Sequence, residues 1–175
     1  DYLFIPKSND IYKKKNKKFK LNKKDKILCA KFRKGHFEGV LNVMNRLLNI
    51  IKAKKIFMGE KDFQQLYLLK KYLSKKYDIN IINCPTIRDA NKVALSTRNY
   101  LLSKKNYIKV SLITKYLFNL KNKLNKNSKS IYKFLKEQII KLENVYKVKF
   151  DYLEIRNEKD LSLNRLKKNR IFIAY

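Results

Sequence analysis

Apolar residues along the chain occur in short blocks and in helical stripes, separated by lysine-rich stretches. Four short apolar blocks predict strands, at residues 2–5, 27–30, 56–58 and 78–82. Apolar residues spaced three and four apart predict helices at residues 40–51 and 63–73, and Asp62 is the expected N-cap of the second. A strand, a helix and a strand joined by short connections form a βαβ unit. Because the strands are short and apolar, we expect a parallel sheet covered on both faces.

The second half of the chain has a different pattern. Helical spacing predicts two long helices, at residues 103–122 and 129–146, and apolar runs predict strands at residues 150–155 and 171–175. These elements indicate a second, smaller α+β domain, joined to the first near residue 87. A polar run with nine lysines, residues 13–26, is expected to be a solvated loop or an exposed ribbon.

The composition is that of a globular protein, because hydrophobic residues make up 45% of the 175. No apolar run approaches the roughly 18 residues of a transmembrane helix, so we expect no membrane partner. The net charge of +30 raises the alternative of a basic nucleic-acid-binding protein. Only seven of the 44 basic residues are arginine, however, and DNA-binding proteins favour arginine for bidentate contacts. We therefore attribute most of the charge to drift in an A/T-rich genome and expect no specific nucleic-acid partner.

Residues that are rare in this composition carry the most information. The three glycines fall within one 25-residue window, at positions 35, 39 and 59, where we expect the backbone to require them. The two cysteines, Cys29 and Cys84, are expected to be buried, reduced thiols. The single histidine, His36, is expected to be structural. With only one histidine in these 175 residues, the sequence offers little support for a His-based metal site or a Ser-His-Asp triad.

A first candidate site follows the predicted strand 56–58, where the chain reads Gly59-Glu60-Lys61-Asp62. Glycine allows a ligand to approach the backbone closely, and Lys61 adds a cation to the amide donors of a helix N-terminus, which suits a phosphate. Gln65, one turn into the helix, is placed to hold a neutral polar group. A helix cap with a solvated lysine explains the same residues, so both interpretations stay open.

A second candidate site is Leu95-Ser96-Thr97-Arg98-Asn99. Two adjacent hydroxyls and a guanidinium can wrap a polyphosphate, because hydroxyls bond the oxygens while arginine pairs with them bidentately. Ordinary helix capping explains the hydroxyls equally well. Arg98 favours the phosphate interpretation, since arginine is scarce in this chain.

Taken in order, three segments resemble the pantoate–β-alanine ligase family. The family patterns are R-P-G-H-F-x-G-V, F-G-E-K-D-x-Q-Q-L and P-T-x-R-[ED]-x-x-G-L-A-[ML]-S-S-R-N. Here residues 33–40 read RKGHFEGV, residues 58–66 read MGEKDFQQL, and residues 85–99 read PTIRDANKVALSTRN. Lys34 replaces the family's proline, Lys92 its glycine and Thr97 its second serine, which keeps the hydroxyl. If the glycine has a positive φ, Lys92 strains the loop by about 1 kcal/mol or more.

The resemblance implies an α/β fold with an incomplete Rossmann-like parallel sheet of the class I nucleotidyltransferase type and a second, smaller α+β domain. Residues 1–87 would form the first part and residues 88–175 the second. The implied reaction joins pantoate and β-alanine to pantothenate through a pantoyl adenylate, consumes ATP with Mg²⁺, and releases AMP and pyrophosphate. Members of the family are typically cytoplasmic homodimers, and residues 13–31 are the candidate dimer edge.

Carried over by position, the family's site residues fall on the two candidate sites. The residues implied to contact ATP are Gly59, Glu60, Lys61, Asp62, Ile87 (through its backbone), Leu95, Ser96, Thr97 and Arg98. Lys61 and Arg98 would be catalytic by stabilising phosphate charge at one triphosphate, Gln65 would hold pantoate, and Asp62 would be the metal ligand. Such a site works by positioning and charge neutralisation.

Some parts of the family pattern have no counterpart in these 175 residues, among them an N-terminal His-x-x-His region and the extreme C-terminus. We therefore expect the chain to be a piece of the enzyme that is inactive, or nearly so, by itself. Two further alternatives stay open: another nucleotidyltransferase of the same superfamily, and a decayed enzyme that keeps only its fold.

Overall fold

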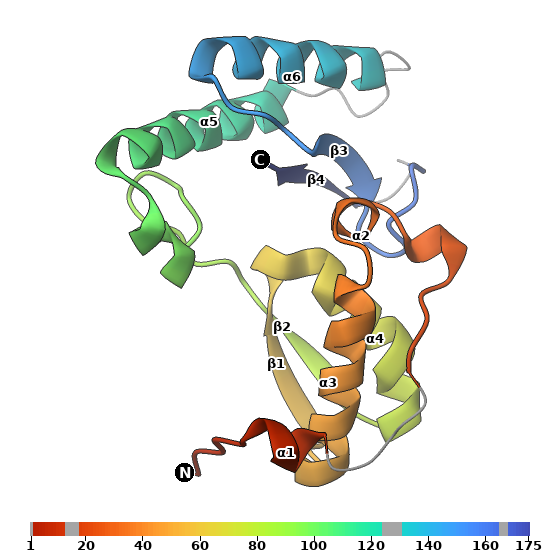
Figure 1. Ribbon diagram of the computed structural model, residues 1–175. Helices are drawn as coiled ribbons and strands as arrows, with labels where there is room; N and C mark the ends of the chain where they lie inside the picture. The colour runs from red at the N-terminus through yellow and green to blue at the C-terminus, as the bar shows by residue number, and fades with distance from the viewer. Residues whose placement is uncertain (1, 13–17, 124–130, 165–167) are drawn as a thin grey trace. The chain divides into compact units, whose positions relative to one another are not determined.

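The chain forms two compact units, Asp1–Pro85 and Thr86–Tyr175, in a computed structural model that describes residues 2–12, 18–123, 131–164 and 168–175 (Figure 1). Each unit has its own packed interior and is described by itself. The expected assignment of residues 1–87 to a nucleotidyltransferase part and of residues 88–175 to a C-terminal part stays a prediction.

The first unit is built around two parallel strands and two helices. Its elements are α1 (Ser8–Ile11), η1 (Lys23–Asp25), α2 (Cys29–Phe32), α3 (His36–Ile51), β1 (Lys55–Gly59), η2 (Glu60–Asp62), α4 (Phe63–Tyr77) and β2 (Asn80–Cys84). β1 pairs with β2 in parallel, with Phe57 opposite Ile82 and Gly59 opposite Cys84. This confirms the predicted βαβ unit, with β2 starting two residues later than expected because Asp78 takes a left-handed conformation that ends α4.

Helices α3 and α4 pack against each other beside the sheet (Figure 1). The buried leucines of α4 include Leu66, Leu69 and Leu73 at the predicted spacing, and burying such side chains is the main stabilising term of the unit. α3 begins four residues earlier than the apolar stripe suggested. Gly35, immediately before it, has φ +76°, a left-handed conformation that glycine adopts without steric cost.

Two predicted strands of the first unit are wrong. Residues 2–5 form no strand, and Tyr2 and Leu3 are exposed, because a strand needs a neighbouring strand to satisfy its backbone groups. Residues 27–30 instead form a turn that leads into α2, where the N–H of Ala30 donates to the carbonyl of Ile27 at 3.0 Å. Leu28 is 2% exposed and has φ +50°, so this apolar block is buried in a turn rather than in a sheet.

One face of the β1–β2 sheet is open in the described part of the chain. Ile56 and Met58 point toward the core shared with α3 and α4, whereas Phe57 between them is 66% exposed. Within the described part of the first unit, the expectation of a sheet covered on both faces is not met for these strands, because α3 and α4 pack on the side of Ile56 and Met58 and leave Phe57 exposed.

The described part of the lysine-rich run, residues 18–26, is largely solvated as expected, since its five lysines are exposed, but three of its other side chains pack inward. Leu21 and Asp25 are buried, and Phe19 packs against the core. In place of an exposed ribbon, residues 18–31 form η1, a turn and α2. Residues 13–17 of the predicted run lie outside the described residues.

Asp25 anchors this segment to α4. One carboxylate oxygen lies 2.5 Å from Nζ of Lys71, and the other accepts a hydrogen bond of 2.7 Å from the hydroxyl of Tyr72. The Tyr72 hydroxyl in turn accepts from the N–H of Asn22 at 3.0 Å. Burial lowers the pKa of Lys71, but hydrogen bonding and attraction to Asp25 outweigh it and leave that pKa raised.

The second unit packs two helices over a strand pair. Its elements are η3 (Thr97–Leu101), α5 (Lys104–Lys123), α6 (Ile131–Tyr146), β3 (Tyr152–Asn157) and β4 (Asn169–Ala174). β3 and β4 are antiparallel, with Leu153 opposite Ile173, and α5 and α6 lie side by side (Figure 1). Leu120, Leu135 and Leu153 belong to the shared core. Both predicted helices and both predicted strands are confirmed to within a few residues, although the expected start of α6 at residue 129 lies outside the described part.

Among the described residues, no helix combines the length and apolar character that crossing a membrane requires.

Candidate functional site

The turn that follows β1 gathers most of the first candidate site. β1 ends at Gly59, Glu60 to Asp62 form a single 3₁₀ turn, and α4 begins at Phe63. Gly59 has an ordinary extended backbone, and a Cβ atom there would meet nothing within 4 Å. The described neighbours therefore do not require a glycine, but its bare backbone leaves room for a ligand.

Lys61 and Asp62 are both exposed on this turn. Nζ of Lys61 lies 3.6 Å from the carboxylate of Asp62, and the Asp62 side chain is 63% exposed. Asp62 precedes α4 at the expected position, yet its side chain makes no capping hydrogen bond. The capping interpretation therefore does not explain this carboxylate, which stays available beside the Lys61 ammonium.

The carboxyl end of the neighbouring strand meets the same turn. Nδ2 of Asn83, on β2, donates to Oε1 of Glu60 at 3.1 Å, and Nζ of Lys70 donates to Oδ1 of Asn83 at 2.5 Å. In open parallel sheets, ligands bind beyond the carboxyl ends of the strands. Both described strands of this sheet end here, so the turn lies where such a ligand is expected.

The two adjacent glutamines at the start of α4 have different environments. Gln65 is half-buried, as a ligand-binding amide must be if a substrate is to reach it. Gln64 is 5% exposed, and its Nε2 donates to the carbonyl of Ile27 at 2.7 Å. Its Oε1 is buried with no hydrogen-bond partner among the described groups. Sequence reasoning missed Gln64 as the link between this turn and the segment before α2.

The second candidate site is one end of a folded loop. The N–H of Leu95 donates to the carbonyl of Ile87 at 3.0 Å, and Arg88 and Ala94 form an isolated antiparallel bridge. Oγ of Ser96 accepts from the N–H of Arg98 at 3.3 Å, which is the capping role considered from the sequence. Thr97 and Arg98 are exposed on η3. The loop thus brings Ile87 and residues 95–98 together.

Asp89 organises the inside of this loop. Its carboxylate accepts hydrogen bonds from the N–H groups of Asn91 at 2.8 Å and Val93 at 3.0 Å, and from the hydroxyl of Tyr107 on α5. The Tyr107 hydrogen bond, together with the two backbone donors and the charge of Lys115, lowers the pKa of Asp89 below 3.8.

Because the pKa of Asp89 is lower in the folded loop than in an unfolded chain, ionised Asp89 stabilises the loop. That stabilisation is present above pH 3.8 and is lost as the pH falls through the lowered pKa of the folded state. We expect an NMR titration of the Asp89 carboxyl carbon to show a midpoint below 3.8. Tyr107→Phe should raise that midpoint, and an unchanged midpoint would show that the hydroxyl does not stabilise the carboxylate.

Lys92 lies at the tip of the loop with φ +67°, in the left-handed region. This is the position where the family pattern has glycine, so the strain expected from the sequence is present. We expect Lys92→Gly to raise the free energy of unfolding of this unit by about 1 kcal/mol, because glycine carries no Cβ penalty there. Chemical denaturation measures the change, with Lys105→Gly in α5 as a control that should be destabilising. No gain for Lys92→Gly would mean that the lysine side chain offsets the strain.

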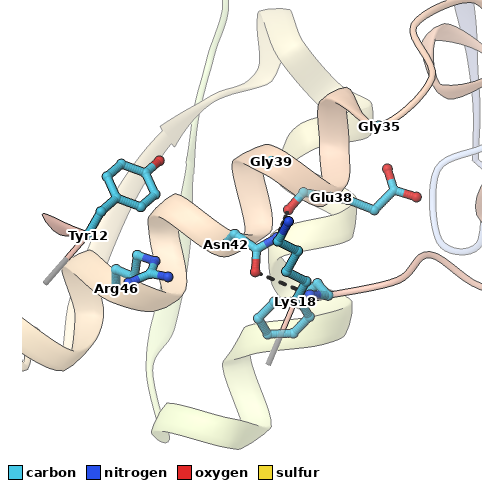
Figure 2. A pocket seen from close by; sticks show the side chains of 8 residues that line it. Tyr12, Lys18, Gly35, Glu38, Gly39, Asn42 and Arg46 are labelled. Carbon is cyan, nitrogen blue, oxygen red and sulfur yellow. Dashed lines mark hydrogen bonds between the residues drawn. The ribbon is translucent and has the colours of Figure 1, made fainter. Parts of the chain in front are cut away.

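The motif at residues 33–40 forms the start of α3 and a nearby hollow. Nη2 of Arg33 lies 3.3 Å from Nδ1 of His36, whose ring packs on Phe37. Figure 2 shows a hollow of about 490 Å³ on the α3 surface. It is lined by Tyr12, Lys18, Phe19, Gly35, Glu38, Gly39, Asn42 and Arg46. None of the predicted site residues lines it.

Two polar side chains around this hollow, those of Asn42 and Arg46, make hydrogen bonds within the protein. Asn42 accepts from the N–H of Phe19 at 3.2 Å and donates to the carbonyl of Glu38 at 2.7 Å (Figure 2). Arg46 donates to the carbonyl of Ile11 at 3.2 Å and stacks on Tyr12. These contacts hold the N-terminal segment on α3.

Other sequence expectations have mixed outcomes. Cys29 and Cys84 form no disulfide with each other, as expected, but each is half-buried rather than buried. Within the described ranges, no group of three or more His, Cys, Asp or Glu side chains could hold a metal ion. A cation at Asp62 would therefore depend on ligands from a substrate and from water.

Comparison with known proteins decides the family. The family model described as "Pantoate-beta-alanine ligase" matches residues 1–175. The chain belongs to the pantoate–β-alanine ligase family. It is 40% identical over 159 residues to a bifunctional pantoate ligase/cytidylate kinase of Prochlorococcus marinus subsp. pastoris, covering 88% of this chain and 30% of that protein.

Solved structures of the family have the same fold. A pantoate-β-alanine ligase (pantothenate synthetase) from Thermus thermophilus superposes with a TM-score of 0.81 at 22% identity, covering 99% of this chain and 64% of that one. A pantoate-β-alanine ligase from Francisella tularensis, complexed with β-γ ATP and β-alanine, has a TM-score of 0.69 at 30% identity, with coverages of 94% and 61%. The likeness confirms the predicted α/β fold class of the nucleotidyltransferase type.

The chain spans less than two thirds of each of these pantoate–β-alanine ligases. The two family motifs described above, around Lys61 and around Arg98, each form one continuous turn or loop. Their meeting at one triphosphate stays a prediction.

Proposed function

We propose that this chain contributes the phosphate-binding and pantoate-binding residues of an ATP-dependent pantoate–β-alanine ligase. The observation that carries the proposal is the turn of residues 59–65, where the family's sequence follows β1 with an exposed Lys61 and a half-buried Gln65. The Francisella tularensis relative, complexed with β-γ ATP and β-alanine, supports the choice of substrates.

The proposed reaction has two displacements. The pantoate carboxylate attacks the α-phosphorus of ATP, the bond to the bridging oxygen breaks, and pyrophosphate leaves with the electron pair. The amine of β-alanine then attacks the acyl carbon of pantoyl adenylate, loses a proton, and expels AMP to give the amide of pantothenate. Both steps move negative charge onto phosphate oxygens, so cations fixed beside those oxygens lower the barrier.

The proposed role of each residue follows from the chemistry of its side chain or backbone. Lys61 and Arg98 neutralise the phosphate charge, and the hydroxyls of Ser96 and Thr97 donate to phosphate oxygens. Gly59 and Ile87 contact the nucleotide through their backbones, with Glu60 and Leu95 beside them. The Gln65 amide holds a hydroxyl or carboxylate oxygen of pantoate.

Mg²⁺ fits this site as an ion shared with ATP. The exposed Asp62 carboxylate supplies one oxygen ligand, and Mg²⁺ is commonly bound by one or two carboxylates together with substrate phosphates and water. The ion would supply further charge neutralisation on the phosphates. We also propose, from the family alone, a cytoplasmic homodimer.

The test is pantoate-dependent exchange of label between pyrophosphate and ATP, which reports the first displacement alone. It should be run on the polypeptide that carries these 175 residues in the cell and, in parallel, on the 175-residue chain, which we expect to be inactive or nearly so. Exchange that needs pantoate supports the ligase. Exchange supported by a different acid indicates another nucleotidyltransferase of the superfamily, and no exchange indicates a decayed enzyme.

A further inference from the structure

Asp89 has no role in the proposed reaction. Its carboxylate nevertheless accepts three hydrogen bonds, two of them from backbone N–H groups within the loop of residues 86–99. We propose that Asp89 is a positioning residue that sets the shape of this loop, and with it the placement of Ile87 and residues 95–98, before a nucleotide binds. The inference rests on the proposed function, because that function makes residues 95–98 a phosphate-binding segment.

The contacts of Asp89 close the loop from its centre. Its Oδ1 accepts from two backbone N–H groups, of Asn91 at 2.8 Å and of Val93 at 3.0 Å. Its own N–H donates to the carbonyl of Val93 at 2.9 Å, and its carbonyl accepts from the N–H of Lys92 at 2.9 Å. One residue therefore fixes both sides of the five-residue tip, including the strained Lys92.

The tip sets the register of the two arms that carry the proposed ligand contacts. Next to it, Arg88 and Ala94 form a backbone bridge, and the N–H of Leu95 donates to the carbonyl of Ile87. Nδ2 of Asn99 then donates to the carbonyl of Ala94 at 3.0 Å, which ties the end of the segment back to the same arm. A change at the tip would therefore shift the Arg88–Ala94 bridge first and then the hydrogen bonds of Leu95 and Asn99.

The loop is also fastened to one side of α5. The Tyr107 hydroxyl donates to Oδ2 of Asp89, and Nζ of Lys115 donates to Oδ1 of Asn91 at 3.1 Å. The guanidinium of Arg88 lies 5.2 Å from the ring centroid of Phe118. Tyr107, Lys115 and Phe118 are spaced by eight and three positions, which places them on one face of a helix.

A preformed loop binds phosphate more tightly than a flexible one, because ordering the backbone would otherwise oppose binding. The Asp89 carboxylate accepts from the N–H groups of Asn91 and Val93 and from the Tyr107 hydroxyl, so it stabilises the loop and does not contact the ligand in this proposal. Ser96, Thr97 and Arg98 are thereby held with their donors fixed, and the proposed function assigns no phosphate contact to Asp89.

The experiment compares Asp89→Ala, Asp89→Asn and Asp160→Ala in the polypeptide that carries these 175 residues in the cell. Asp160 is the matched control, since it also accepts a backbone hydrogen bond, from Ser162 at 2.9 Å, in a different loop of the same unit. Asp89→Asn keeps an oxygen that accepts from the N–H groups of Asn91 and Val93. The measurements are amide hydrogen exchange at Asn91, Val93 and Leu95, and ATP affinity by calorimetry at physiological salt.

We expect Asp89→Ala to speed exchange at these amides and to weaken ATP binding, each by about tenfold, because the N–H groups of Asn91 and Val93 lose their hydrogen-bond acceptor. Asp89→Asn should restore most of both, and Asp160→Ala should change neither. In a double-mutant cycle with Arg98→Ala, the two losses of ATP affinity should be less than additive, because Asp89 acts through the segment that carries Arg98.

Three outcomes would overturn the proposal: unchanged exchange in Asp89→Ala, faster exchange with unchanged ATP affinity, or fully additive losses with Arg98→Ala. If the unaltered polypeptide does not bind ATP but Asp89→Ala still frees the amides, the ordering role of Asp89 is supported and the proposed nucleotide site is wrong.

Discussion

Lys61→Ala, in the polypeptide that carries these 175 residues in the cell, is expected to lower the rate of pantoate-dependent ATP–pyrophosphate exchange by about 100-fold to 1000-fold. Fixed donors that stabilise charge developing in a transition state typically contribute this much. Lys61 is exposed on the turn after β1, and its described ionic neighbour is the Asp62 carboxylate at 3.6 Å. Little in the folded unit depends on this ammonium, so its loss should affect catalysis and not folding.

The matched control for this variant is Lys75→Ala. Lys75 is exposed near the other end of α4, so the substitution makes the same change in net charge far from the turn along the helix. The exchange rate of Lys75→Ala should stay within about twofold of the rate of the unaltered protein, since surface charges at a distance are screened by salt. If Lys61→Ala behaves like this control while pantoate-dependent exchange persists, Lys61 is not the phosphate-binding cation.

Lys71→Met is expected to lower the free energy of unfolding of the first unit by about 3 kcal/mol. Removing one partner of a buried ion pair leaves the other charge uncompensated. Asp25 is 4% exposed, and Lys71 Nζ lies 2.5 Å from its carboxylate. We expect a loss of free energy of unfolding at the lower end of the range for broken buried ion pairs, because a quarter of the Lys71 side chain is exposed.

Urea unfolding followed by circular dichroism measures this loss. The double variant Asp25→Asn with Lys71→Met should recover part of it, because the remaining amide carries no charge and can still accept from the Tyr72 hydroxyl. Lys75→Met, on the exposed part of the same helix, should change stability by less than about 0.5 kcal/mol. A loss in Lys75→Met equal to that in Lys71→Met would show that the ion pair is not the cause.

The sequence predicted the elements that show their own periodicity. α4, α5 and α6 each carry apolar residues at helical spacing, and each formed close to its predicted bounds. The block at residues 27–30 was misassigned because four apolar residues in a row look alike in a strand and in a buried turn. Only the packing of Leu28 with a positive φ distinguishes them, and that packing depends on residues distant in the sequence.

Polar residues in the interior could not be predicted for the same reason. Asn45 lies on the buried face of α3, where it accepts from the hydroxyl of Tyr77 at 2.7 Å, a residue 32 positions later. Asp25 is buried because Lys71 and Tyr72 reach it from α4. The sequence motifs located both candidate sites, around Lys61 and around Arg98. The hydrogen bonds of Gln64 and Asp89 could be identified only from the folded structure.

Exposed Phe57 has a consequence for handling the protein. Its ring lies on the side of β1 and β2 that the described helices of the unit leave uncovered, and exposed apolar side chains favour association between copies. With a net charge of +30, copies repel one another in dilute electrolyte. Concentrated salt, the usual remedy when a basic protein carries nucleic acid through purification, would weaken that repulsion and promote precipitation.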